Sequence, residues 1–81
     1  MRYGTQTRLS PAEVLNRART FFGMGGELGL PEAPGGPGSL SFATDAGGVT
    51  VTTAGTDGQT EVTVLSREYD YWAERFIREL H

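Results

Sequence analysis

The sequence predicts an α+β domain of two layers, with two helices on one face of a four-stranded antiparallel sheet, in the order β-α-β-β-β-α. Two segments have apolar residues at helical spacing, and four have apolar and polar residues in alternation. Turn-forming residues separate the last three alternating segments. With 81 residues, the chain is long enough for one thin core, so we expect a single domain over residues 1–81.

The first two expected elements are a short strand and a helix. Residues 1–7 alternate in the manner of a half-exposed strand. Ser10 is a good N-cap, Pro11 suits the first helical position, and Glu13 completes a capping box. We expect Gly23 to end this helix in the left-handed conformation that glycine adopts without strain. The apolar face of the helix is formed by Val14, Leu15, Ala18, Phe21 and Phe22.

Residues 23–38 are rich in glycine and proline, which fill ten of the sixteen positions. Proline has no N–H to donate, and glycine disfavours regular structure. We therefore expect a loop that forms neither helix nor strand. Leu28 and Leu30 are the side chains expected to anchor this loop to the core.

Three strands are expected after the loop, joined as an antiparallel meander. They cover residues 39–43, 49–54 and 61–64. Turn-like segments at residues 45–48 and 55–58 connect them. One face of the sheet carries Val, Leu and Phe, and the other is rich in Thr. Leu65 falls on the polar side of the alternation, which favours a bulge or an edge contact there.

The last expected element is a second amphipathic helix, with Asp70 as its N-cap. Its exposed face carries two pairs of opposite charge four residues apart, Glu74 with Arg78 and Arg75 with Glu79. Its apolar stripe consists of Tyr69, Trp72, Ala73, Phe76, Ile77 and Leu80.

The composition excludes several kinds of chemistry. The chain has no cysteine, which rules out disulfides, thiolate metal ligands and a thiol nucleophile. The single histidine, His81, stands at the last position, where chain ends commonly fray, so we expect no metal and no cofactor.

The charge and the hydropathy also exclude some partners. The net charge is −3 and there is no basic run, so we expect no nucleic-acid partner. No apolar run approaches the ~20 residues of a membrane span. The first residues lack the apolar core of a signal peptide, so we expect a cytoplasmic protein without a membrane partner.

Glu61, Glu68 and Asp70 are the candidates for acid–base chemistry, because paired carboxylates can act together as general acid and base. Glu61 and Glu68, however, fall on opposite sides of the strand alternation, and helix capping accounts for Asp70. We therefore expect a protein that is not an enzyme and has no catalytic residues.

One pattern in the sequence consists of residues 49–53, a glycine turn, residues 60–64 and residues 67–72 ahead of the last helix. This pattern resembles the end of helix-grip domains of the START and polyketide-cyclase type. A strand followed by Ser-Pro-Ala-Glu-Val at residues 10–14 is similar to their beginning. The family has further strands where residues 23–38 stand, so the resemblance implies a reduced domain whose last helix grips a curved sheet and which binds an apolar small molecule. The sequence is also similar in style to short bacterial proteins, which implies no activity.

Two functional hypotheses follow. In the first, the protein is a binding module that self-associates as a homodimer through an edge strand or its aromatic last helix. The net charge of +3 over residues 1–20 and of −6 over residues 21–81 is consistent with contact between unlike ends.

In the second hypothesis, an apolar small molecule binds between the C-terminal helix and the sheet. The candidate ligand or interface residues are Leu40, Phe42, Val51, Val64, Tyr69, Tyr71, Trp72 and Phe76.

Overall fold

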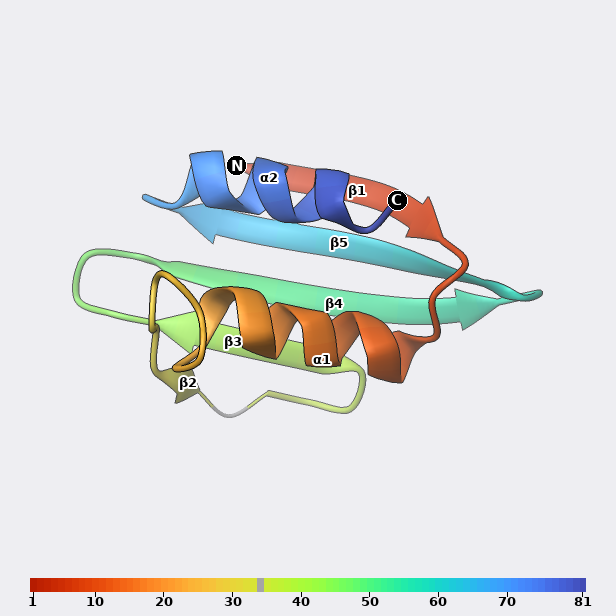
Figure 1. Ribbon diagram of the computed structural model, residues 1–81, viewed down its shortest axis with the longest axis horizontal. Helices are drawn as coiled ribbons and strands as arrows, with labels where there is room; N and C mark the ends of the chain where they lie inside the picture. Colours follow the sequence, from red (N-terminus) through yellow and green to blue (C-terminus); the bar gives the residue numbers. More distant parts are fainter. Residues whose placement is uncertain (34) are drawn as a thin grey trace.

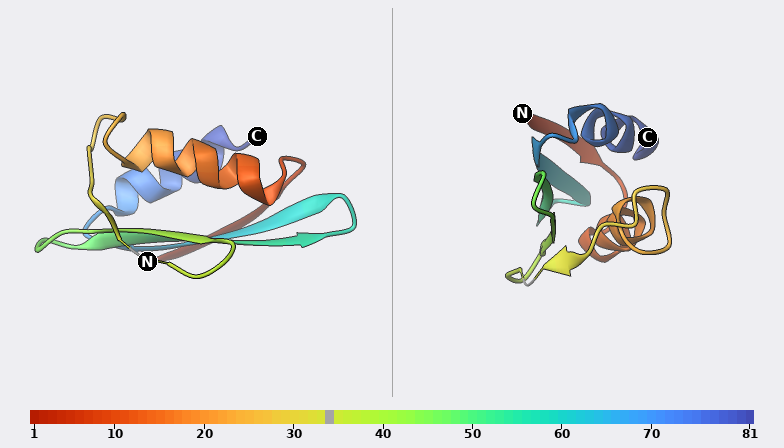
Figure 2. Two further views of the ribbon diagram at one scale, coloured as in Figure 1. Left: turned by 90° about the horizontal axis from the view of Figure 1, so that it is seen from below. Right: turned by 90° about the vertical axis from the view of Figure 1, so that its left-hand side faces the viewer.

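The computed structural model describes residues 1–33 and 35–81. Within these residues the chain forms two helices and a five-stranded antiparallel sheet, in the order β-α-β-β-β-β-α (Figure 1). The strand order across the sheet is β1-β5-β4-β3-β2. Figure 2 shows that both of these helices lie on the same face of the sheet. The α+β class and the antiparallel sheet are therefore confirmed, whereas the expected number of strands is wrong by one.

The helix α1 (Pro11–Phe22) follows the edge strand β1 (Arg2–Thr7) and starts after the predicted N-cap Ser10. The Ser10 hydroxyl accepts a hydrogen bond from the Glu13 amide at 3.1 Å. The helix also ends before Gly23 as expected, but the expected left-handed conformation is wrong, because Gly23 is extended with a φ of −83°. Glycine suits this position for another reason, since a Cβ there would collide with the Arg19 carbonyl oxygen.

The strand β2 (Glu32–Ala33) lies in the segment that we expected to be an unstructured loop. It pairs with β3 (Ser39–Ala43), placing Glu32 opposite Phe42. Contacts with distant parts of the chain explain why local composition did not reveal it. Glu32 forms an ion pair with Arg19 of α1 at 3.0 Å, and the Leu30 amide donates to the Phe22 carbonyl at 2.8 Å. Pro34, which the loop prediction also covered, lies outside the described residues.

The strands β4 (Gly48–Thr56) and β5 (Gln59–Arg67) complete the predicted meander but are longer than expected. They can be longer because the turn between them needs two residues, Asp57 and Gly58, which both have positive φ. The register of β5 is continuous through Leu65, which lies opposite Thr50. No bulge is needed there, because the Leu65 side chain stays on the open face of the sheet with 48% of its surface exposed.

The helix α2 (Asp70–Glu79) begins differently from the prediction. Asp70 is its first residue rather than its N-cap, and the N-cap residue Tyr69 makes no side-chain capping bond. The chain leaves β5 through Glu68, which has a positive φ of 72°, so the turn is complete one residue before the expected cap. The Tyr69 hydroxyl shares a hydrogen bond with the Thr44 hydroxyl at 3.1 Å, which fixes this start against the β3–β4 connection.

The core lies between the helices and the sheet. The helix α1 packs over β3 and β4, and α2 packs over β5 and β1 (Figure 2). A buried polar contact supports this layer, since the Thr60 hydroxyl donates to the Leu9 carbonyl at 2.6 Å. The buried apolar side chains are Val14, Ala18, Phe22, Leu30, Leu40, Phe42, Val49, Val51, Val62, Val64, Ala73, Phe76 and Leu80.

Candidate functional site: the groove between the helices

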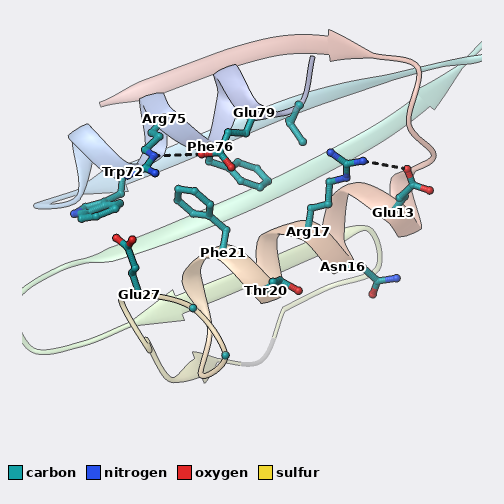
Figure 3. Close-up of a pocket in the computed structure, with 13 residues that line it drawn as sticks. Glu13, Asn16, Arg17, Thr20, Phe21, Glu27, Trp72, Arg75, Phe76 and Glu79 are labelled. Atoms are coloured by element: carbon teal, nitrogen blue, oxygen red, sulfur yellow. Dashed lines mark hydrogen bonds and ion pairs between the residues drawn. The ribbon is translucent and has the colours of Figure 1, made fainter.

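A groove with a volume of about 600 Å³ opens between α1 and α2 on the side away from the sheet (Figure 3). It exists because each helix packs over its own pair of strands, so the two helices do not close against each other. Side chains from both helices and from the connection that follows α1 line it. We call this space the interhelical groove.

The floor of the interhelical groove is aromatic. The rings of Phe21 from α1 and Phe76 from α2 meet with centroids 5.5 Å apart. The Trp72 ring stands edge-on to Phe21, with centroids 6.3 Å apart. Phe76 is 1% exposed and belongs to the core, whereas Phe21 and Trp72 are only half-buried. The floor therefore continues the core upward and ends in an apolar surface that water can reach.

The rim of the interhelical groove is charged. Arg75 contacts Glu79 at 3.2 Å, and Arg17 lies 3.9 Å from Glu13, in both cases four residues apart on one helix. The Arg75 guanidinium also lies over the Trp72 ring, 5.6 Å from its centroid. The pKa of Arg75 is raised above its ordinary value, mainly by the hydrogen bond from its guanidinium to Glu79 and further by nearby negative charges that include Glu27.

The residues that the sequence proposed for a ligand under the C-terminal helix are divided by the structure. Four of them lie inside the core beneath the helices and are almost fully buried: Leu40, Phe42, Val51 and Val64. Phe76 joins this core from above, and Trp72 reaches the interhelical groove. The space between α2 and the sheet is thus filled by the protein's own side chains, and the groove that Trp72 lines lies beside α2, between α2 and α1.

The two tyrosines of the predicted set are separated from each other. Tyr69 is half-buried and bonded to Thr44, whereas Tyr71 is 63% exposed. Tyr71 packs edge-on against Trp72 with ring centroids 5.1 Å apart. It therefore supports the Trp72 ring from outside the groove.

The candidate acidic residues do not converge. Glu61 lies near the start of β5, where it pairs with Gln6 and Ala54, whereas Glu68 and Asp70 lie beyond the other end of the same strand. Among the described residues, no group of three potential metal ligands is close enough together to hold a metal ion. These three carboxylates therefore form no acid–base pair, and the groove exposes an aromatic surface.

The sequence interpretation missed Phe21 and Glu27 as site residues. Phe21 was assigned to the buried face of α1 along with Phe22, but consecutive helical residues point about 100° apart. Two adjacent aromatic residues at the end of one helix were thus a signal that one of them faces elsewhere. Glu27 carried no such signal, because it stands in the glycine-rich segment after α1.

Together, the fold and the groove define a small α+β domain with a two-helix layer that is open at its centre. No known protein family, curated protein or solved structure matches this chain. Within residues 1–33 and 35–81, neither helix has the length and the apolar character needed to cross a membrane.

Proposed function

We propose that the protein is a small binding module that holds an apolar small molecule in the interhelical groove. The observation that carries this proposal is a groove of about 600 Å³ with an aromatic floor that is partly exposed at Phe21 and Trp72. Ligand sites commonly have volumes of roughly 300–1,000 Å³, apolar and aromatic walls, and a few polar groups at defined places. The groove has a volume in this range and an aromatic floor, and polar and charged side chains form its rim.

The energetic basis of the proposal is the apolar surface that the groove leaves in contact with water. A ligand gains about 2.5 kcal/mol for every 100 Å² of apolar surface that it removes from water, counted over both partners. Part of this gain offsets the loss of translational and rotational freedom on binding. An apolar molecule long enough to contact Phe21, Phe76 and Trp72 at once would therefore bind more tightly than one that contacts a single ring.

The resemblance to helix-grip domains supports a related proposal about the mode of binding. The resemblance implies that an apolar ligand would lie between the last helix and the sheet. In this chain that space is packed, with Val51 and Val64 fully buried there. We therefore propose that the ligand binds along the flank of α2 that faces α1, so that α1 replaces the sheet as the second wall.

The test uses the fluorescence of Trp72, which is the single tryptophan of the chain. We expect titration with 1-octanol to shift its emission to shorter wavelength and to saturate. Phe21→Ala should weaken this binding about fivefold or more, because the variant removes a ring from the groove floor. Leu65→Ala is the matched control, since Leu65 lies on the open face of the sheet and should leave the binding unchanged. A change that never saturates, or one that is equal in both variants, would contradict the proposal.

A second candidate function is self-association through the edge strand β1. The Ser66 amide donates to the Met1 carbonyl at 2.8 Å, which makes this a hydrogen-bonded pair of the ladder. Because such pairs alternate along antiparallel strands, the backbone groups of Arg2, Gly4 and Gln6 point away from β5. An edge with a row of unpaired N–H and C=O groups is a template for another strand, and two copies of β1 can pair about a two-fold axis near Gly4.

Substitution of Gly4 tests this candidate with a matched pair of variants. Gly4→Pro removes the outward N–H but leaves the ladder to β5 intact, because proline is tolerated on the solvent side of an edge strand. Gly4→Ala keeps the N–H, and its Cβ would make an ordinary contact of 3.7 Å with the Val62 carbonyl oxygen. We expect sedimentation to show dimers for the parent chain and for Gly4→Ala, and monomers for Gly4→Pro. A parent chain that stays monomeric at high concentration excludes self-association through β1.

A further inference from the structure

The charges around the interhelical groove do not cancel. Two arginines and three glutamates line it. Arg75 is paired with Glu79, and Arg17 with Glu13, so each pair contributes no net charge. Glu27 makes no ion pair with any described residue, and its side chain is exposed. The groove therefore carries a net charge of −1, and the carboxylate outside the two ion pairs is that of Glu27, which lies near enough to Arg75 to help raise its pKa.

This carboxylate is at the end of the groove where Trp72 lies. Glu27 comes from the connection after α1, and its carboxylate points toward the Trp72 ring (Figure 3). Arg75 approaches the same ring from another side, 5.6 Å from its centroid. The face of an aromatic ring is negative, so it attracts a cation and disfavours an anion. The Trp72 ring and the Glu27 carboxylate thus act in the same direction on a charged ligand.

We infer that the groove takes an amphipathic organic cation, such as an alkylammonium, whose positive end lies between Glu27 and Trp72. This inference rests on the proposed function of the groove and adds the chemical class of its ligand. The apolar part of the ligand then lies along Phe21 and Phe76 toward Leu80. From Trp72 to Glu79 the groove follows two turns of α2, or about 10 Å, which suits a short alkyl chain or a pair of fused rings.

The main alternative is a ligand with a negative end. Such a ligand would have to displace Glu13 from Arg17, or Glu79 from Arg75. It would also meet the negative charge of Glu27 at the Trp72 end. For these reasons the charge arrangement favours a cation over an anion of the same shape.

The experiment compares three ligands that share one alkyl chain: octyltrimethylammonium, 1-octanol and octanoate. We expect Trp72 fluorescence to show that the cation binds about tenfold more tightly than the alcohol, from the combined cation–π and ion-pair contributions at an exposed site. Octanoate should bind least tightly. Added salt should reduce the preference for the cation, because exposed charges are screened.

Substitution of the carboxylate gives the specific test. Glu27→Gln should weaken binding of the cation about threefold and leave 1-octanol unchanged. Glu61→Gln is the matched control, because Glu61 is an exposed carboxylate on β5 that does not line the groove. It should change neither ligand.

The outcomes separate this inference from the proposed function. If none of the three ligands binds, the proposed function itself is wrong. If the cation and the alcohol bind equally and Glu27→Gln changes nothing, the groove binds apolar molecules but the inference about charge is wrong. If octanoate binds most tightly, the inference is also wrong, and the arginines select the ligand.

Discussion

Phe21 and Phe22 are neighbours at the end of α1, yet their side chains enter different surroundings. Phe22 is fully buried and contacts Phe42 of the sheet, with ring centroids 5.7 Å apart. Both rings contact Phe76 of α2, but only Phe21 reaches the interhelical groove, where it stays partly exposed. The sheet offers α1 a continuous apolar face, whereas α2 lies over other strands and leaves space beside it. Burial on this helix is thus decided by what the neighbouring layer supplies, not by the type of residue.

The comparison between Phe21 and Phe22 predicts its largest effect for the free energy of unfolding. Phe22→Ala should lower the free energy of unfolding by about 3–5 kcal/mol, because it empties a closed part of the core. Phe21→Ala should cost less, about 2–3 kcal/mol, since its side chain is partly exposed and its removal opens no closed cavity. Urea denaturation of both variants measures the difference. Equal costs would show that the groove floor is as closed as the core.

A second pair of neighbours extends the comparison to the two faces of the sheet. Val64 is fully buried beneath α2, and Leu65 lies on the open face. Val64→Thr should cost about 1–3 kcal/mol, because it places a hydroxyl in the core without a partner. Leu65→Thr should change stability by less than about 0.5 kcal/mol. Thermal unfolding checks both, and a costly Leu65→Thr would indicate that the open face is covered in solution.

The smallest expected effect is a dependence of the free energy of unfolding on pH, and it arises from Tyr3 of β1, which lies near Asp70 and Glu74 of α2. Burial raises the pKa of the Tyr3 hydroxyl above its ordinary value of 10.0, with a further increase from the charges of Asp70 and Glu74. Well below pH 10, Tyr3 is protonated in both the folded and the unfolded chain, so it does not change the free energy of unfolding with pH. As the pH rises above 10, the unfolded chain loses this proton first, so the free energy of unfolding falls.

Replacement of this tyrosine isolates its share of the pH dependence. Tyr3→Phe should make the alkaline fall in stability shallower, as measured by urea denaturation between pH 9 and about pH 11.5. If the free energy of unfolding falls equally steeply in the parent chain and in Tyr3→Phe, then Tyr3 has the same pKa in the folded and the unfolded chain.

The helices and the meander could be predicted because their signals are local. Ser10 and the apolar spacing after it define α1, and the alternation around Val51 and Val64 defines the central strands. Details set by distant contacts could not be predicted in the same way. The strand β2 depends on pairing with β3 and on the ion pair from Glu32 to Arg19.

The candidate site was predicted less well than the fold, for a physical reason. The alternation of strand residues shows that Leu40 and Val51 face inward, but not whether the space in front of them is filled. Trp72 was among the predicted residues and lines the groove, yet its neighbours there depend on how far apart the helices lie. That distance follows from the strand order of the sheet, which placed α1 and α2 over different strands.

The two edge strands of the sheet differ in length, and this difference limits how many chains could join edge to edge. β1 has six residues, whereas β2 has two and can offer few hydrogen bonds to an incoming strand. If two copies join through β1, both outer margins of the combined sheet are formed by β2. A third chain would then find only these two-residue edge strands, which offer too few hydrogen bonds to extend the sheet further.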